Sequence, residues 1–255
     1  MIASTMTIKH KRTIYLIIGI AFWLILWESL SHLVGIYYVL PSFTQTLAAL
    51  FNLLLNGEFY LTVFLSLGRI ALGLLLGIAL GVLLGFLSHF SELAYYITHP
   101  ILSVIRSTPV ASIIILLWFF ISKDYIPIAI GLFMVGPIIW QSTYDALHIK
   151  NKELSEVAEI FCLSPRKKIK ILVLPTLIKY LFPAIVTSSG LAWKAGVAAE
   201  IITYTKMSIG FEIAESKNML EGADMFAWSA TVILLSVGIE SLIKFVVRRL
   251  QKKWD

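Results

Sequence analysis

Three ionisable side chains, Arg69, Lys194 and Glu200, lie inside long apolar stretches of this 255-residue sequence. A charge at the centre of a membrane-spanning helix costs about 2.5–3.5 kcal/mol on insertion scales, so each of the three is a candidate functional residue. A cationic Arg69 or Lys194 beside a water-filled path would lower the electrostatic barrier to an anionic solute. We therefore take these three residues as candidates for a translocation path.

Three other interpretations of these charges stay open. In the first, the charges pair between helices. In the second, the long side chains of Arg69 and Lys194 extend to the membrane interface. In the third, Glu200, near the outer end of its stretch, is simply solvated. Lys194 and Glu200 are six residues apart, or about 240° around an α-helix, so they do not pair along one helix face. Each of them therefore needs a partner on another element.

Residues that commonly catalyse reactions are not arranged to do so here. No Ser-His-Asp set or pair of carboxylates stands out, and no Gly-x-x-x-x-Gly-Lys-Ser/Thr loop for nucleotide phosphates occurs. The single Cys162 cannot form an intrachain disulfide. None of the five histidines has metal-ligand spacing to another: they are His10, His32, His89, His99 and His148. We expect no catalytic residues, no metal, no cofactor and no ATP hydrolysis by this chain itself.

The composition places the chain in a membrane. It is 58% hydrophobic and 14% charged, with a mean hydropathy of +0.87, whereas soluble domains average about 45–50% apolar and about 25% charged residues. Water-soluble folds are therefore excluded, and the long unbroken apolar runs also exclude an outer-membrane barrel. The sequence predicts an all-α polytopic helical bundle that forms one membrane domain over residues 1–255.

Six apolar runs are candidate spans, and we expect the core region at 61–247. The first, at about 13–33, follows a basic amino end and is read as an uncleaved span, because it is too long for a signal peptide and no small-x-small cleavage site follows. The third is the weakest, since Pro100 and Pro109 would interrupt a continuous helix, and residues 92–105 either span or lie along the interface. In chain order, the second to the sixth runs are at about 61–88, 107–122, 125–147, 179–203 and 225–247.

The distribution of Lys and Arg predicts the orientation. Of the 21 Lys and Arg residues, fifteen lie near the amino end, in the polar segment after the fourth run, or near the carboxyl end. Only Lys123, Lys206 and Lys217 lie in the segments on the opposite side. Because cytoplasmic segments are enriched in these residues, we expect both termini in the cytoplasm. The same bias accounts for the net charge of +6 without nucleic-acid binding.

Glycines recur every four residues in the second run, at Gly73, Gly77, Gly81 and Gly85. This spacing places them on one helix face, where another helix can approach closely. Close helix packing is the favoured interpretation, and a dimer seam or a sliding surface between helices is the alternative.

Residues 148–178 form the longest polar interruption, and they are predicted to be a cytoplasmic pair of short helices. Asn151 can cap the first helix, and Ser164 and Pro165 suit the cap and the first position of the second. A helix lying on anionic lipid headgroups would show the same amphipathic pattern. The apolar face of the first helix consists of Leu154, Val157, Ala158 and Phe161.

The spacing within this segment resembles the cytoplasmic signature of binding-protein-dependent ABC importer permeases. That signature reads Glu-Ala-Ala, three residues, Gly, nine residues and then Ile-x-Leu-Pro. Val157, Cys162 and Leu172 replace its first Ala, its Gly and its Ile, and the Cys departs from a Gly that tolerates unusual backbone conformations. The matching positions are Glu156, Val157, Ala158, Cys162, Leu172, Val173, Leu174 and Pro175.

Further fragments resemble the nitrate, sulfonate and taurine branch of that family, so the resemblance covers nearly the whole chain. These fragments are Leu40-Pro41-Ser42, Arg69 with Gly73 and Gly77, Arg106-Ser107-Thr108-Pro109, Trp118-Phe119 and the run from Ala192 to Glu200.

The resemblance implies the transmembrane permease subunit of an ATP-driven importer with the type I fold. Its partners would be a cytoplasmic ABC ATPase that binds the ATP, an extracytoplasmic solute-binding protein and a second permease copy in a homodimer, within the lipid of the cell membrane. The solute would be small and anionic, similar to nitrate, a sulfonate or taurine. The residues expected to couple to the ATPase are Glu156, Val157, Ala158, Phe161, Cys162 and Pro165.

An ion-coupled secondary transporter is the alternative function. In that case Arg69, Lys194 and Glu200 would form an ion or proton relay. The family-like cytoplasmic segment favours the importer.

Overall fold

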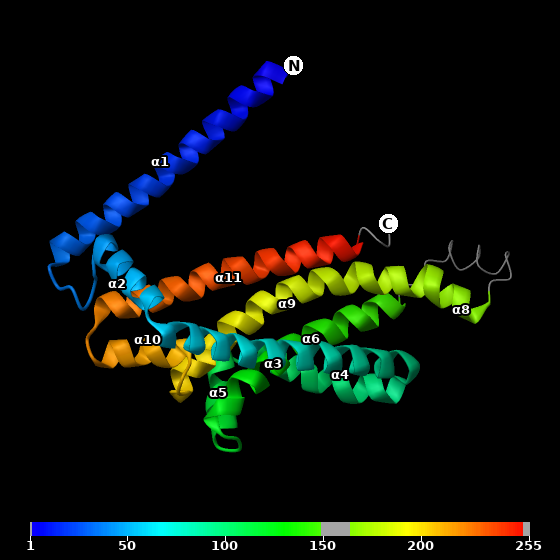
Figure 1. Ribbon diagram of the computed structural model, residues 1–255. Helices are drawn as coiled ribbons and strands as arrows, with labels where there is room; N and C mark the ends of the chain where they lie inside the picture. The colour runs from blue at the N-terminus through cyan, green and yellow to red at the C-terminus, as the bar shows by residue number, and fades with distance from the viewer. Residues whose placement is uncertain (1, 149–163, 252–255) are drawn as a thin grey trace. The chain divides into compact units, whose positions relative to one another are not determined.

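The computed structural model describes residues 2–148 and 164–251, which form helices and short connections without a β-strand (Figure 1). The predicted all-α class is confirmed. The chain forms two compact units, one of residues 1–60 with 212–231 and the other of residues 61–211 with 232–255. Each unit is described by itself.

Within residues 2–148 and 164–251, five helices are long and apolar enough to cross a membrane, and a bent pair of shorter helices makes a sixth candidate span. The expectation of about six spans is therefore confirmed. The bent pair consists of α4 (Glu92–Ser107) and α5 (Val110–Trp118), which meet at 105°. The long helices are α1 (Ile2–Val34), α3 (Gly57–Phe90), α6 (Ile126–His148), α9 (Leu174–Thr203) and α11 (Gly222–Gln251).

The bent pair shows which proline interrupts the weak third span. Pro109 directly precedes α5 and follows the bend, as predicted, but Pro100 lies inside α4 without breaking it. The expectation that Pro100 also interrupts the helix is wrong. Pro100 lies on the exposed side of α4, where its ring removes one backbone hydrogen bond while the rest of the helix continues.

In the first unit, the short helix α2 (Phe43–Leu55) was not predicted. Its first turn is closed by a reciprocal pair of bonds, in which the Ser42 hydroxyl accepts from Gln45 N at 3.1 Å and Gln45 Oε1 accepts from Ser42 N at 3.0 Å. Glu28 of α1 adds a second cap, because its Oε2 accepts from Phe43 N at 2.8 Å. These bonds hold the start of α2 beside the end of α1.

In the second unit, α6 packs against both α3 and α9. The four glycines of α3 lie against it: a Cβ on Gly73 would be 2.5 Å from Ile128 O, and a Cβ on Gly81 would be 2.7 Å from Gly136 O. This confirms the predicted close packing at these glycines. α6 also packs against α9. Ile114, Ile126, Ile130, Ala195 and Ala199, from α5, α6 and α9, form a buried cluster.

The second half of the predicted cytoplasmic segment is helical from Pro165 onward. α8 (Pro165–Lys168) begins at Pro165, as expected, and a π-helical turn at Ile169–Val173 leads directly into α9. The fifth span therefore starts earlier than the predicted residue 179. The first predicted helix of this segment, with Asn151, lies outside the described residues.

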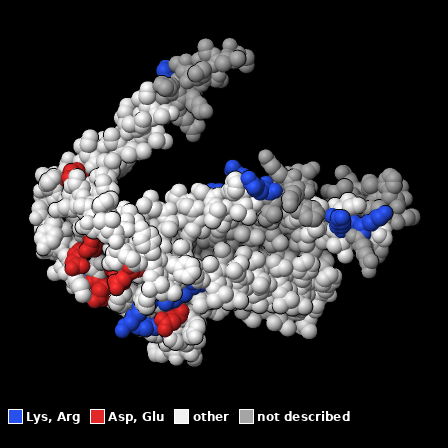
Figure 2. Space-filling view, viewed as in Figure 1, with Lys and Arg blue, Asp and Glu red and all other residues white. Residues whose placement is uncertain are grey.

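Charged side chains occupy only a few places on the face drawn in Figure 2. Large apolar side chains are widely exposed instead, for example Leu75 at 63% and Phe64 at 70% on α3. Such exposure is expected of helices whose solvent is lipid.

Candidate functional site

Glu200 lies near the carboxyl end of α9 and is completely buried, with an exposed fraction of 0%. The interpretation that it is solvated is therefore wrong. The reason is that the chain folds back over it after Thr203: Gly210 approaches so closely that a Cβ there would be 2.4 Å from Glu200 Cβ. Only a glycine fits at this position.

The Glu200 carboxylate is bonded to α3 and to the start of α10 (Ile209–Asn218). Its Oε2 accepts from the Ser66 hydroxyl at 2.9 Å and from Gly210 N at 3.3 Å. The Ser66 oxygen in turn accepts from Ile209 N at 2.9 Å. Ser208 accepts from Phe211 N at 3.0 Å. Three backbone donors in the first turn of α10 are thus satisfied, and the carboxylate lies at the positive end of the helix dipole.

Arg69 completes this cluster from α3. Its Nη1 is 3.9 Å from Glu200 Oε1, and its side chain is only 18% exposed. The guanidinium also donates to Met207 O at 3.1 Å and to Lys206 O at 3.3 Å. Among the residues that the structure describes, no hydrogen bond reaches Glu200 Oε1, so the Arg69 charge is its closest compensation.

The turn between α9 and α10 is held in an uncommon backbone conformation. Tyr204 and Met207 have φ angles of 51° and 53°, in the left-handed region that non-glycine residues rarely adopt. Lys123 Nζ donates to Tyr204 O at 3.2 Å, and Thr205 Oγ1 donates to Lys123 O at 3.2 Å. The two cations, Arg69 and Lys123, therefore fix the turn through its carbonyl groups.

Lys194 does not belong to this cluster. It is exposed on α9, whereas its neighbour Trp193 is buried and donates through Nε1 to Val232 O of α11 at 3.1 Å. The structure thus brings together two of the three ionisable residues singled out from the sequence, Arg69 and Glu200, and places the third elsewhere.

The uncharged members of the cluster, Ser66, Ser208 and Gly210, were not predicted from the sequence. Ser66 lies three residues before Arg69, on the same side of α3, and Ser208 directly precedes α10. Both positions carry a recognisable signal, an i, i+3 neighbour and a helix cap. Neither signal identifies Glu200 as the partner, because Ser66 and Glu200 are 134 residues apart in the chain.

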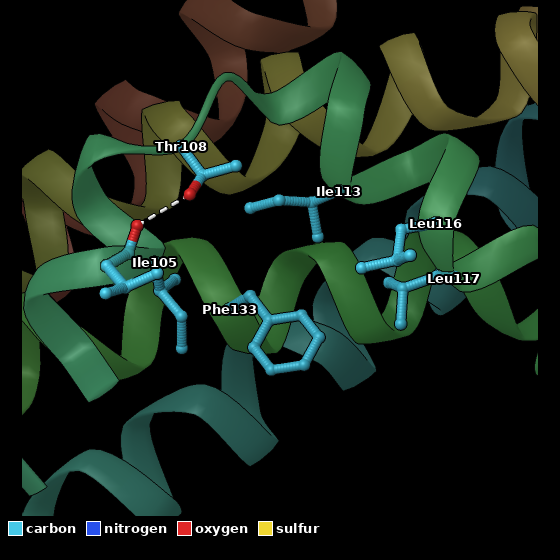
Figure 3. Close-up of a pocket in the computed structure, with 7 residues that line it drawn as sticks. Ile105, Thr108, Ile113, Leu116, Leu117 and Phe133 are labelled. Carbon is cyan, nitrogen blue, oxygen red and sulfur yellow. Dashed lines mark hydrogen bonds between the residues drawn. The ribbon is translucent and has the colours of Figure 1, made fainter.

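A separate cavity of about 230 Å³ lies in the angle between α4 and α5, with Phe133 of α6 as one wall (Figure 3). The only hydroxyl in its lining, on Thr108, already donates to Val104 O at 2.7 Å. This cavity can accommodate an apolar group but offers no free donor for a polar one. Its remaining lining residues are Val104, Ile105, Ile113, Leu116 and Leu117.

Most of the residues expected to couple to an ATPase lie outside the described part of the chain. Pro165 is described, as the first residue of α8, and Lys167 in the same helix is exposed. The residues outside the description are Glu156, Val157, Ala158, Phe161 and Cys162.

Comparison with known proteins extends over most of the chain. The putative aliphatic sulfonates transport permease protein SsuC of Bacillus subtilis (strain 168) is 25% identical over 218 residues, 84% of this chain and 78% of that protein. The nitrate import permease protein NrtB of Leptolyngbya laminosa is 29% identical over 191 residues, 72% of this chain and 66% of NrtB. A probable ABC transporter permease protein of Brucella melitensis biotype 1 is 23% identical over 215 residues, 83% of this chain and 86% of that protein.

A family match covers the part of the chain that contains the glycine face of α3, the predicted cytoplasmic segment, the Glu200 end of α9 and all of α11. It extends over residues 73–253 and is described as the binding-protein-dependent transport system inner membrane component. These relatives are membrane subunits of transporters and not enzymes. The chain belongs to this family, and it is a multi-pass inner-membrane permease of the ABC transporter class.

Proposed function

We propose that this chain is the permease subunit of an ATP-driven importer, working as a homodimer that docks a separate cytoplasmic ATPase through residues 151–165. Both termini lie in the cytoplasm, and an extracytoplasmic binding protein delivers the solute. ATP-driven closure of the ATPase pair draws the two docking segments together and switches the path between outward and inward access.

The observation that carries this proposal is the Glu156–Pro175 spacing, which lies within the matched segment 73–253, after the end of α6 and up to the first turn of α9. A docking element needs a short rigid helix with one small apolar face, and Val157, Ala158 and Phe161 supply such a face. The helical chain from Pro165 through Ile169–Val173 into α9 supports transmission of the movement, since it joins the docking segment to α9 by a continuous run of helix.

The solute class is proposed as a small anion of the sulfonate or nitrate type. The names of two relatives, which specify aliphatic sulfonates transport and nitrate import, support this class. Mass spectrometry of the ligand carried by the co-purified binding protein would identify the solute.

The docking assignment is tested with Ala158→Arg and Phe161→Asp. Each places a charge on the proposed docking face, so the permease should no longer co-purify with the ATPase, and uptake stimulated by the binding protein should be lost. Met219→Asp is the matched control, because Met219 is 59% exposed in a different connection and its variant should retain the ATPase. Normal assembly and uptake in both docking variants would refute the assignment.

An uptake measurement on the purified permease distinguishes the importer from an ion-coupled carrier. The purified permease in vesicles, without the ATPase, should show no uptake under an ion gradient. Gradient-driven uptake by the permease alone would favour the carrier instead.

A further inference from the structure

One narrow face of α9 is exposed along the middle of the span. Pro183, Thr187, Leu191 and Lys194 are exposed at spacings of four, four and three residues, which is one side of an α-helix. The helix is otherwise well packed, with Ser188, Ala192 and Trp193 buried. Beside this face, a Cβ added at Gly190 would meet no heavy atom within 4 Å. The surface is therefore open, and only one of its four exposed residues is large and aliphatic.

The exposed side of α3 has the opposite composition. From Leu61 to Leu87 every exposed residue of α3 is apolar, and the large side chains include Phe64, Leu75 and Leu83. This is the surface expected of a helix that faces lipid. Beside the apolar Pro183 and Leu191, α9 presents the hydroxyl of Thr187 and the ammonium group of Lys194, two polar groups to which lipid chains offer no hydrogen bond.

Lys194 lies deep in the span. Gly196, two residues further along α9, packs so closely on α3 that a Cβ there would be 2.6 Å from Ile70 Cγ1. Ile70 lies near the middle of α3, with exposed apolar residues toward both ends of that helix, so Lys194 is at the depth of the lipid-facing leucines.

The lysine side chain does not reach the nearer end of α9. Thr203, where α9 ends, is nine residues beyond Lys194, or about 13 Å along the helix. Helical side chains tilt toward the helix N-terminus, so the Lys194 side chain tilts away from that end. Extension to the outer interface therefore does not explain its position.

The charged residues around Lys194 do not cancel its positive charge. Its electrostatic neighbour is Glu240 of α11, which is itself paired with Lys244. These three residues together carry a formal charge of +1. Arg69 and Glu200, by contrast, are bonded to each other's helices and to the turn at residues 204–208. Of the three candidates from the sequence, Lys194 alone combines exposure with mid-span depth.

We propose that the exposed α9 face of Pro183, Thr187, Leu191 and Lys194 borders a water-filled solute path, in which the Lys194 ammonium favours anions, and that Arg69 and Glu200 serve to hold the fold. This proposal rests on the proposed transport function and assigns its path to a surface. A hydrated cation on a path wall lowers the barrier for an anion and raises it for a cation.

Water access is tested by thiol labelling of the full chain in membrane fragments. Thr187→Cys places a thiol on the proposed path face, and Leu75→Cys places one on the exposed α3 surface, where Leu75 is 63% exposed. The nucleophile that attacks a cationic methanethiosulfonate, and expels its methanesulfinate group, is the ionised thiol, which needs water, so position 187 should react at least about ten-fold faster than position 75. Peptide mass spectrometry follows each position separately from the native Cys162. Equal, slow labelling at both positions would show that α9 faces lipid and overturn the proposal.

The charge is tested by comparing anionic and cationic methanethiosulfonates at Thr187→Cys. Positions 187 and 194 are about 10 Å apart along one helix face. One unit charge acting through water over that distance alters the ratio of the two rates by about four-fold. Lys194→Gln should lower the anion-to-cation ratio by about this factor, and Lys194→Arg should preserve it. An unchanged ratio in Lys194→Gln would overturn the assignment of Lys194.

Neither labelling experiment requires ATPase docking or uptake. If the docking variants refute the importer function, the labelling still reports whether the α9 face is hydrated and positive. If the labelling fails while docking succeeds, the importer function stands and the path lies elsewhere.

Discussion

Helices α3 and α9 both pack against α6, yet the residues on their exposed sides differ in polarity. α3 places glycines against α6 and large apolar side chains such as Leu75 outside. α9 buries Trp193 and a run of small residues, and it leaves Thr187 and Lys194 outside. Both helices are apolar enough to span a membrane. The comparison teaches that the composition of the exposed side, rather than the mean hydropathy of the helix, separates a lipid-facing surface from one that faces water or protein.

The two helices also share one polar connection. Arg69 and Ser66 of α3 meet Glu200 of α9 in a buried cluster that caps α10. Charges inside the spans therefore occur in two settings in this molecule: Arg69 and Glu200 form a buried link between helices, and Lys194 is exposed on the surface proposed to border the path.

The largest effect is expected from removing the buried link. Glu200→Ala leaves Arg69 without its carboxylate and leaves Gly210 N and the Ser66 hydroxyl without an acceptor. Breaking a buried ion pair by deleting one partner costs about 3–5 kcal/mol, so the midpoint of thermal unfolding in detergent should fall strongly. Lys194→Ala is the control and should cost far less, since Lys194 is exposed. Equal falls in the unfolding midpoints of Glu200→Ala and Lys194→Ala would contradict the assignment of Glu200 to a stabilising link and of Lys194 to an exposed surface.

The second-largest effect is expected when a lysine is introduced on the exposed side of α3, in comparison with the exposed side of α9. Leu75→Lys on α3 places an ammonium among lipid chains and should cost about 2.5–3.5 kcal/mol. Leu191→Lys on α9 introduces the same group at a residue that is 44% exposed on the proposed path face, where water solvates it at little cost. The measurement is the unfolding midpoint of both variants in lipid vesicles. If Leu191→Lys were as destabilising as Leu75→Lys, the two surfaces would face the same solvent.

The sequence predicted the long spans because apolar run length is a local property. The short helices α2 and α10 were missed. Both carry a local signal for their first turn, the Ser42–Gln45 capping pair before α2 and the Ser208 cap before α10. The first backbone donor of α10 is nevertheless satisfied by Ser66, 143 residues away, so its packing against α3 could not be predicted from a local pattern.

The candidate site shows the same limit. Residue type identified Arg69 and Glu200 as unusual, because a charge in an apolar run is visible in the sequence. Their meeting could not be predicted, since the turn that covers Glu200 depends on the left-handed backbone of Tyr204 and Met207, which are not glycines. Tertiary bonds from Arg69 to that turn hold it closed.

A third contrast lies within α3 itself. Gly73→Ala would bring a Cβ to 2.5 Å from Ile128 O, whereas nothing lies within 4 Å of a Cβ at Gly68. The first change forces α3 and α6 apart and should cost about 1–3 kcal/mol. Gly68→Ala should be neutral or stabilising by up to about 1 kcal/mol, through helix propensity. Unfolding midpoints of the two variants check this, and equal midpoints would mean that the glycine face is not the packed one.

The smallest effect is expected on the pH dependence of stability, from Glu212 of α10, a half-buried carboxylate outside the spans. Burial, with added repulsion from Glu215 and Glu58, raises the pKa of Glu212 above its ordinary value. The folded chain therefore holds this proton at a higher pH than the unfolded chain does. Its contribution favours the folded state below the ordinary pKa and is lost as the pH rises through the raised pKa.

Glu212→Gln should accordingly flatten the fall in unfolding midpoint between about pH 4 and about pH 7, and the variant should be the more stable form at neutral pH. Glu215→Gln is the control, because it removes one of the two repelling carboxylates and leaves Glu212 itself, so it should flatten the curve only in part. The effect stays small because water still reaches Glu212, in contrast to the completely buried Glu200. Parallel curves for wild type and Glu212→Gln would mean that water screens Glu212 fully and that its partial burial does not raise its pKa.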